Sequence, residues 1–350
     1  MKLFINARFL TQPVSGVQRY GIECSRQIKA LYPDCVFVTP VGVLHHDVAK
    51  ELGAIVVGKR SGHIWEQVDL PRYLAGQGYP PLVNLANTGP VYYKNNFCVI
   101  HDLAFFHHPE WNSRLFATWY NFMVPRLARN SKHIFTVSNT VKNELQSFFH
   151  LPPGKISVTY NGLGPGMSKA AGGNVAKEKI IITVGTFNLR KNQHTLVRAF
   201  LQSTIKDEYK LVLAGERNKI FADSGIAADV AGNRVEILEK LTDEQLVALY
   251  QRAEILVSLS NYEGFGIPVL EGLFWKCKVL CSDIPVYHEL FEPYVGFCDQ
   301  NSVADVAARL TEIANSGRVP ADADITALQT RYNYKEAAQT IIDRVVGFNK

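Results

Sequence analysis

Short apolar runs alternate with helix-like segments along most of the chain, and this alternation constrains the fold more than any other feature of the sequence. Residues 1–7 and 179–185 are such runs, and helix-like segments follow them at residues 16–31 and 193–202. Strands that are separated by helices pair in parallel, and the helices then cover both faces of the sheet. The sequence therefore predicts an α/β fold of doubly wound parallel sheets, with ligands bound beyond the carboxyl ends of the strands.

The length and one glycine-rich stretch indicate two domains. A chain of 350 residues can bury two full hydrophobic cores. Residues 162–179 are rich in small residues and contain Gly162, Gly164, Gly166, Gly172 and Gly173. This composition interrupts regular structure and marks a domain boundary, and a joint at such a boundary permits closure on a substrate.

Residues 261–271 carry two carboxylates, Glu263 and Glu271, eight positions apart around a Gly-Phe-Gly-Ile-Pro segment. An apolar strand precedes the stretch, and a helix begins in it with Pro268 in the first turn, where a missing N–H costs nothing. We expect Glu263 in the loop and Glu271 in the first helical turn, near backbone N–H groups that bind anions. The structural alternatives are a solvated Glu263, and a Glu271 that only complements the helix dipole.

Polar and glycine residues at other strand ends are further candidates. Arg190 and Lys191 follow a glycine-ended strand, where they can neutralise a diphosphate or lie solvated on the surface. His101 ends another strand, where a neutral imidazole can donate or accept a hydrogen bond, or simply close the strand. Gly16 opens a helix after the first strand, either as a plain turn residue or as a point where backbone approaches a phosphate. A G-x-G-x-x-G motif is missing there, which argues against a dehydrogenase.

The run Ser-x-x-Glu-Gly-Phe-Gly-Ile-Pro-x-x-Glu that ends at Glu271 resembles the hallmark of the retaining nucleotide-sugar glycosyltransferases of family 4. The residues 15–20 also resemble the first loop of these enzymes. The resemblance implies the GT-B fold, in which two Rossmann-like doubly wound domains face each other across a cleft. It implies an acceptor-side domain over 1–168, a donor domain over 169–335, and a C-terminal helix over 336–350 that crosses back to the first domain.

The resemblance also assigns roles to the candidate residues. Glu263 is expected to contact the donor sugar and Glu271 the ribose diol, through charge-assisted hydrogen bonds. Arg190 and Lys191 are expected to hold the diphosphate in place of a metal ion, and His101 to face the sugar near the reacting carbon. The remaining donor-binding positions that the resemblance implies are Gly16, Phe265, Gly266 and Ile267. No metal and no cofactor are expected, since the nucleotide-sugar donor is a substrate.

The implied function is retaining transfer of a hexose, with mannose from GDP-mannose as the first choice, to a glycan or lipid-linked glycan. The implied process is assembly of a bacterial surface polysaccharide such as the O-antigen of lipopolysaccharide. Two alternatives remain open: a nucleotide-sugar epimerase of the same fold, and a sugar-nucleotide-binding protein without catalysis. A phosphorylase would need a pyridoxal-binding lysine, which nothing in the sequence marks. No nucleic-acid partner is expected.

Charge and aromatic content differ along the chain. Residues 1–168 contain 16 Lys and Arg against 9 Asp and Glu, a balance of +7, whereas the remainder contains 21 against 23, a balance of −2. A basic half suits an anionic partner such as a membrane surface or a diphosphate-linked lipid, and the alternative is dispersed charge that aids solubility. The aromatic stretch 111–129 is interpreted as a core helix or as a helix that contacts a membrane or acceptor.

Cysteine spacing and hydropathy indicate the compartment. The six cysteines have no C-x-x-C spacing, so we expect buried thiols in a reducing cytoplasm and no zinc site. No signal peptide and no apolar run of about 18 residues is present. The sequence predicts a cytoplasmic protein that associates peripherally with the inner face of a membrane. The Asp-x-Asp pair at Asp322 and Asp324 is interpreted as a solvated turn rather than as a metal site.

Overall fold

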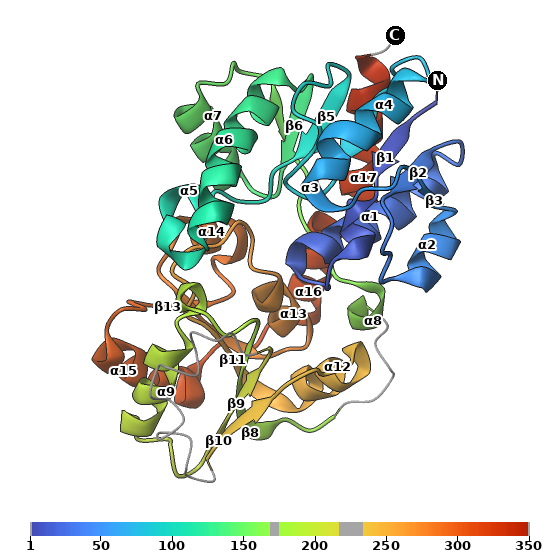
Figure 1. The fold of residues 1–350 in the computed structure, drawn as a ribbon. Helices are drawn as coiled ribbons and strands as arrows, with labels where there is room; N and C mark the ends of the chain where they lie inside the picture. Colours follow the sequence, from blue (N-terminus) through green and yellow to red (C-terminus); the bar gives the residue numbers. More distant parts are fainter. Residues whose placement is uncertain (1, 169–174, 217–233, 349–350) are drawn as a thin grey trace. The chain divides into compact units, whose positions relative to one another are not determined.

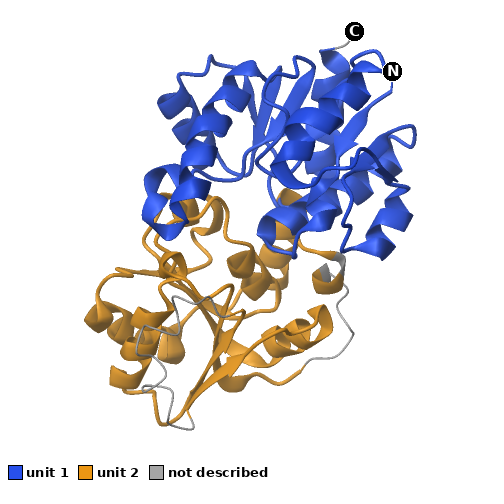
Figure 2. Cartoon of the chain, viewed as in Figure 1, with its two compact units in different colours: residues 1–162, 332–350 blue, residues 163–331 orange. Residues whose placement is uncertain are grey.

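The computed structural model describes residues 2–168, 175–216 and 234–348, and it divides into two compact units (Figures 1 and 2). Unit 1 consists of residues 1–162 together with 332–350, and unit 2 consists of residues 163–331. The chain thus leaves unit 1 after Gly162 and returns at Tyr332, where we expected 168 and 336. Residues 169–174, which include Gly172 and Gly173 of the predicted joint, lie outside the described residues.

Unit 1 contains a parallel sheet with the strand order β3-β2-β1-β4-β5-β6-β7. Its strands are β1 (Phe4–Asn6), β2 (Val36–Thr39), β3 (Ile55–Val56), β4 (Leu82–Asn84), β5 (Asn96–Val99), β6 (His133–Thr136) and β7 (Ile156–Val158). Because all neighbours pair in parallel, every carboxyl end lies at the same edge of the sheet. The order changes direction at β1, as in other doubly wound sheets.

The helices of unit 1 follow the strands as the alternation predicts. They are α1 (Gly16–Leu31), α2 (His46–Leu52), α3 (Gly62–Ile64), a π-helical turn (Trp65–Asp69), α4 (Leu70–Ala75), α5 (Ala104–His107), α6 (Arg114–Asn130), α7 (Asn139–Phe149) and α17 (Tyr334–Gly347). Two short 3-10 turns occupy Arg8–Thr11 and Pro109–Trp111. Ser113 and Ser138 are the N-caps of α6 and α7. Each serine side chain accepts a hydrogen bond from a backbone N–H in the first turn of its helix.

Helices pack on both faces of the unit 1 sheet. Cys98 and Ile134 lie in a core cluster with residues of α6 and α7. Phe97 and His133, one position earlier on the same strands, contact the ring of Phe348 at the end of α17. Because successive side chains of a strand point to opposite faces, α17 covers the face opposite α6 and α7. The C-terminal helix therefore belongs to unit 1 and packs against α1.

Unit 2 contains a second parallel sheet with the order β10-β9-β8-β11-β12-β13. Its strands are β8 (Glu178–Val184), β9 (Lys210–Ala214), β10 (Val235–Leu238), β11 (Ala253–Ser258), β12 (Lys278–Ser282) and β13 (Gly296–Cys298). Its helices are α8 (Pro165–Ser168), a 3-10 turn (Leu189–Lys191), α9 (Gln193–Gln202), α12 (Asp243–Arg252), α13 (Ile267–Phe274), α14 (Pro285–Phe291), α15 (Val303–Ser316) and α16 (Asp322–Arg331). The predicted pair of doubly wound parallel sheets is confirmed.

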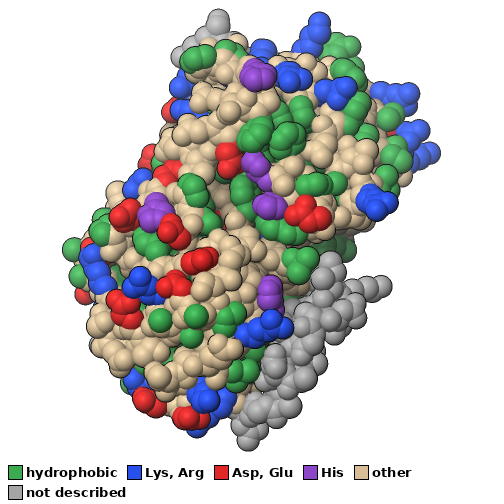
Figure 3. All heavy atoms as spheres, turned by 90° about the vertical axis from the view of Figure 1, so that its left-hand side faces the viewer, with side chains coloured by type: hydrophobic (Ala, Val, Ile, Leu, Met, Phe, Trp, Pro, Cys, Tyr) green, Lys and Arg blue, Asp and Glu red, His purple; other side chains and the backbone are tan. Residues whose placement is uncertain are grey.

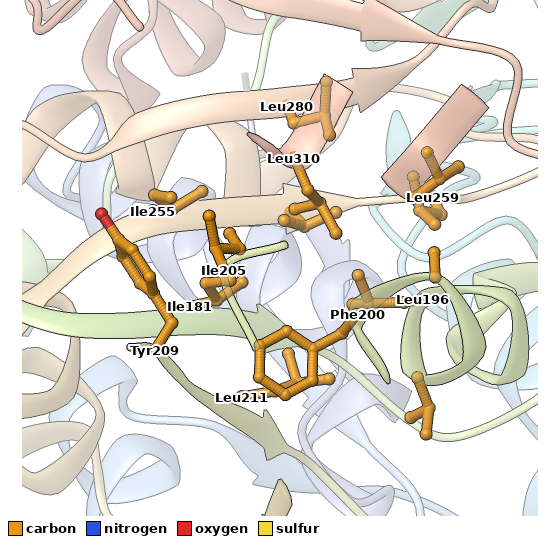
Figure 4. Close-up of a cluster of buried hydrophobic side chains, with 14 of the residues drawn as sticks. Ile181, Leu196, Phe200, Ile205, Tyr209, Leu211, Ile255, Leu259, Leu280 and Leu310 are labelled. Atoms are coloured by element: carbon orange, nitrogen blue, oxygen red, sulfur yellow. The ribbon is translucent and has the colours of Figure 1, made fainter. Parts of the chain in front are cut away.

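The two faces of β11 position the helices of unit 2. Ile255 lies in the cluster that Figure 4 shows, where side chains of β8 and β9 meet Phe200 of α9 and Leu310 of α15. Leu256 points to the other face and meets α13 at Gly272, where an added Cβ would lie 2.5 Å from the leucine Cδ2. Glycine therefore lets α13 approach the strand closely, and this approach fixes the loop that joins them.

Candidate functional site

The predicted strand, glycine loop and helix around residues 261–271 are confirmed. β11 ends at Ser258, and α13 begins at Ile267 with Gly266 as its N-cap and a proline in the first turn. Gly266 has φ 104°, and a Cβ there would lie 2.5 Å from Cε1 of Tyr287. Only glycine tolerates both the left-handed backbone and this close approach. The glycine therefore fixes how the loop enters α13, whose first backbone N–H groups have no acceptor within the helix.

Glu263, Arg190 and Lys191 come together in one cluster, as expected of residues at neighbouring strand ends. Glu263 accepts a hydrogen bond from Arg190 Nη2 at 2.9 Å, and it forms an ion pair with the ammonium of Lys191. The Glu263 side chain is only 7% exposed, so the solvated alternative is wrong. Asn261 ties the two loops together, because its backbone N–H donates to the carbonyl of Arg190 at 2.8 Å.

The charge state of this cluster follows from its neighbours. Burial alone would raise the pKa of Glu263, but Arg190 and Lys191 outweigh burial and lower that pKa from 4.5 to about 2. The carboxylate is therefore ionised at neutral pH and balances one of the two cations. Two cations, Arg190 and Lys191, thus lie against this one carboxylate.

Two glycines that we did not single out shape the strand ends beside Lys191. Gly185 follows β8 with φ 140°, and a Cβ there would lie 3.4 Å from Cε of Lys191. Gly215 follows β9, and its Cβ would lie 2.0 Å from the carbonyl oxygen of Gly185. The sequence did contain a signal for this close packing, because both apolar strands end in glycine. Two strand ends that lie this close leave room only for the hydrogen of a glycine.

Glu271 lies one turn further into α13 than we expected, as the fifth residue of the helix rather than in its first turn. It is 5% exposed, and its Oε2 accepts a hydrogen bond from the hydroxyl of Tyr250 at 2.8 Å. A position beyond the first turn gains little from the helix dipole. Tyr250, on helix α12, was not predicted as the partner of Glu271. The two residues are 21 positions apart, and no local sequence pattern links them.

Phe265 and Ile267 take different positions in the same loop. The Phe265 side chain is 3% exposed and packs edge-on against Phe291 at a centroid distance of 5.8 Å. The structure thus gives this ring a packing role. Ile267 is the first residue of α13, where its backbone N–H has no helical acceptor within the same helix.

In unit 1, His101 is held at the carboxyl edge of the sheet after β5. It is 5% exposed, and its Nε2 donates to the carbonyl of Leu85 at 2.9 Å, since a carbonyl can only accept. Burial lowers the pKa of His101, and this hydrogen bond opposes the effect. In the neutral ring Nδ1 is then the acceptor. The Tyr20 ring of α1 packs edge-on against the imidazole at 4.8 Å.

Gly16 is the first residue of α1, as predicted, and it is exposed. Ser15 precedes it as the N-cap, and the backbone N–H of Ser15 donates to the side chain of Gln18 at 3.2 Å. This capping arrangement begins the helix at the glycine. Since Tyr20 of the same helix contacts His101, both predicted residues of unit 1 belong to one packed region at the carboxyl edge.

Other sequence-based expectations have mixed outcomes. All six cysteines are buried and free, as predicted. Asp322 and Asp324 do not form a solvated turn, because they begin α16 and pair with Lys276 and Arg318. Across residues 2–168, 175–216 and 234–348, no group of three or more His, Cys, Asp or Glu side chains is suited to a metal ion. Metal independence stays a prediction.

The helix α6 confirms the core interpretation of stretch 111–129 for one of its faces, and contact with a membrane or acceptor stays a prediction. Met123, Val124 and Leu127 are buried in the core cluster. Leu115 is 82% exposed, and Phe122 is partly exposed beneath the guanidinium of Arg126, 3.8 Å from its ring centroid. Figure 3 shows hydrophobic side chains and histidines gathered on the visible face of unit 1. Within the described residues, no helix has the length and apolar character needed to cross a bilayer.

Comparison with protein families assigns both halves of the chain. The model of glycosyl transferases group 1 matches residues 168–336, and the model of Glycosyltransferase Family 4 matches residues 14–165. Among curated relatives, the O-antigen chain mannosyltransferase RfbU of Salmonella typhimurium is 29% identical over 56% of this chain and 54% of its own length. The O-antigen chain mannosyltransferase B of Escherichia coli is 26% identical over 61% and 59%. The chain spans about half the length of these curated relatives.

Solved structures share the fold over the whole chain. The Anabaena protein Alr3699/HepE, solved with UDP and glucose, has a TM-score of 0.75 and 15% identity, covering 99% of this chain and 100% of its own. Sucrose-phosphate synthase from Thermosynechococcus elongatus has a TM-score of 0.77 and 14% identity, with complete coverage of both chains. At such identities the likeness shows the fold alone, which is the GT-B fold.

Proposed function

The chain belongs to glycosyltransferase family 4, and on this premise we propose that it transfers mannose from GDP-mannose to a glycan or lipid-linked glycan. The O-antigen mannosyltransferases among its relatives support mannose as the sugar and surface polysaccharide as the product. Transfer retains the anomeric configuration and needs no metal. The observation that carries the proposal is the cluster in which the part-exposed Arg190 and Lys191 hold the buried Glu263, three positions before the N-cap of α13.

Arg190 and Lys191 bind the diphosphate of the donor in this proposal. A guanidinium has five N–H donors and an ammonium has three, so both can hold Glu263 and phosphate oxygens at the same time. Their positive charges stabilise the charge that develops on the departing nucleotide, which is often the largest contribution to catalysis. Gly16 and the backbone of Gly266 and Ile267 supply further N–H donors to the phosphates.

Glu263 orients the donor sugar, and Glu271 binds the ribose. Because two cations already fix Glu263, its oxygens are held in place before the sugar arrives, which reduces the cost of ordering them on binding. Tyr250 fixes Glu271 through a hydrogen bond to Oε2, and a carboxylate is the group that accepts from both hydroxyls of a vicinal diol. His101 accepts from a sugar hydroxyl through Nδ1, since its Nε2 is occupied by Leu85.

The same proposal places the protein at the inner face of a membrane. The exposed Leu115 and the stacked pair of Phe122 and Arg126 give α6 an apolar and cationic outer face. Anionic lipid attracts basic residues, and each contributes on the order of 1 kcal/mol near the surface. Cosedimentation with anionic but not with zwitterionic vesicles, reduced in Leu115→Glu, is the expected result. Equal binding to both vesicle types would contradict this part of the proposal.

The activity is tested with a panel of donors. We expect GDP to raise the melting temperature more than UDP, ADP or dTDP, and GDP-mannose to be consumed with an acceptor glycan present. NMR of the product should show an α-linked mannose, because the donor sugar is α-linked and retention preserves the configuration. A β-linked product would contradict retention. Nucleotide binding without turnover on any acceptor would favour the non-catalytic alternative, and a changed sugar without transfer would favour the epimerase.

A further inference from the structure

A second buried carboxylate lies at the carboxyl edge of the unit 1 sheet, and the predicted roles do not use it. Glu66 is fully buried in the π-helical turn after α3. Its Oε1 accepts from Asn6 Nδ2 at 2.8 Å, from Thr88 at 3.0 Å and from Arg8 Nε at 3.2 Å. Burial would raise the pKa of Glu66, but Arg8 and the hydrogen bonds outweigh it and lower that pKa to about 2.

The other oxygen of Glu66 holds an exposed histidine. His63 Nδ1 lies 3.3 Å from Glu66 Oε2, and because an ionised carboxylate can only accept, Nδ1 carries the proton. In the neutral ring, Nε2 is then an acceptor. The His63 side chain is 31% exposed, while Glu66 is buried. Glu66 and its hydrogen-bond partners thus orient the His63 ring, so that Nε2 is the ring nitrogen left to accept a hydrogen bond.

Aromatic rings from α6 surround this histidine. The ring centroids of Trp119 and Tyr120 lie 5.8 Å and 5.9 Å from that of His63. Among the described residues, none accepts a hydrogen bond from the buried indole N–H of Trp119. A buried donor without a partner costs free energy. Polar groups among aromatic rings are typical of small-molecule sites.

The position and the backbone also favour a ligand site. Arg8, Glu66 and Thr88 follow the carboxyl ends of β1, β3 and β4, the edge at which ligands bind in open parallel sheets. A π-helical turn is rare and occurs frequently at functional sites. Arg8 and Glu66 carry opposite charges and pair at 3.2 Å, so the surface beside them suits an uncharged ligand.

We propose that His63 and Trp119 form the site for a neutral hexose ring of the acceptor, with Glu66 and Arg8 as positioning residues. The hexose stacks one of its C–H faces on the indole, and one of its hydroxyls donates to His63 Nε2. The identification of this sugar as the acceptor rests on the proposed function. Binding of the sugar to the site is tested separately. His63 binds the sugar in this proposal and abstracts no proton.

The test measures binding of methyl glycosides of mannose, glucose, galactose and N-acetylglucosamine to the full chain by saturation-transfer NMR. We expect at least one glycoside to bind, and its Kd to rise about tenfold in His63→Ala and in Trp119→Ala. His63→Gln and Trp119→Phe keep polarity or packing and should weaken binding only about threefold. Far-UV circular dichroism and melting temperatures verify that each variant folds.

His288 provides the matched control. It is also partly exposed, pairs with Asp283 at 2.7 Å and stacks on Phe297, but it lies in unit 2. His288→Ala should leave the glycoside Kd unchanged. If none of the glycosides binds, or if His63→Ala and Trp119→Ala bind like the native chain, the inference is wrong.

Kinetics separate this inference from the proposed function. Where transfer occurs, His63→Ala should raise the KM for the acceptor about tenfold and leave the KM for GDP-mannose unchanged. A structural role alone would alter both constants or neither. Glycoside binding that depends on His63, without any transfer, would contradict the proposed function and support the sugar site. Transfer with an unchanged acceptor KM in His63→Ala would contradict the inference alone.

Discussion

Unit 1 and unit 2 each bury one glutamate beside an arginine at the carboxyl edge of a parallel sheet, yet the two clusters differ in charge and in partners. Glu66 has one cation, Arg8, and uncharged polar side chains complete its hydrogen bonds. Glu263 has two cations, Arg190 and Lys191. The comparison shows that a buried carboxylate at such an edge can be held by one cation with uncharged polar side chains, or by two cations.

The largest expected effect is on stability, and it separates the two clusters. In Glu66→Ala, Arg8 stays buried without its partner, which costs about 3–5 kcal/mol in comparable pairs. Arg190 and Lys191 are 25% and 18% exposed and can be solvated, so Glu263→Ala should cost clearly less. Urea unfolding measures both values. Equal losses would show that the clusters do not differ as described.

Removal of a cation from unit 2 should affect the rate more than the fold. Lys191→Ala loses charge that stabilises the departing nucleotide, and we expect kcat to fall about 10²–10³-fold, as for other groups of this kind.

Glu263→Ala should also abolish transfer while nucleotide binding persists through Glu271. Isothermal calorimetry with GDP checks this split. A parallel loss of GDP affinity in Glu263→Ala would show that the two glutamates have been assigned the wrong roles.

Acid should weaken both clusters in the same pH window. Glu66 and Glu263 have folded pKa values of about 2, below the unfolded value of 4.5. Each therefore contributes stability above pH 4.5, and the contribution is lost as the pH falls from 4.5 towards 2. In that window each group adds up to about 1.4 kcal/mol per pH unit to the slope.

Urea unfolding at pH 5, 4 and 3 measures this slope. Glu263→Gln cannot titrate at this position, so its unfolding free energy should depend less on pH than that of the native chain. A slope identical to the native one would contradict the lowered pKa.

The smallest effect concerns the partner of Glu271. Tyr250→Phe removes one buried hydrogen bond to the carboxylate and should cost about 1 kcal/mol of stability. If Glu271 binds the ribose, the loss of this support should also weaken GDP binding a few-fold, without altering the acceptor KM. Calorimetry with GDP measures the change. An unchanged GDP affinity would show that Tyr250 does not hold Glu271 for the nucleotide.

Local patterns predicted much of this fold, because each element leaves its signal within a few residues. The helix over residues 193–202 and the glycine at the start of α13 follow from periodicity, capping and turn chemistry. Glu271 was placed a turn too early, since sequence marks a helix start with an uncertainty of a few residues. The contacts that define each cluster were not predictable in the same way.

Those contacts join residues far apart in the chain. Arg8 lies 58 positions from Glu66, and Arg190 lies 73 positions from Glu263. Composition and periodicity do not encode which strand ends become neighbours, and a single sequence offers no paired signal for them. Glu66 was missed for this reason, because its segment, Trp65–Asp69, reads as an ordinary amphipathic stretch. Arg190 and Glu263 were each singled out from their local setting, but only a family resemblance gave them roles at one common site.

The return of α17 to unit 1 has a consequence for synthesis. Residues 163–331 leave the ribosome as one continuous segment, whereas the first unit lacks its final helix until residues 334–347 emerge. Early in translation, the surface of α1 that later packs against α17 is therefore uncovered. A nascent chain arrested after residue 331 should present that surface to chaperones, and full release from the ribosome should remove it from their reach.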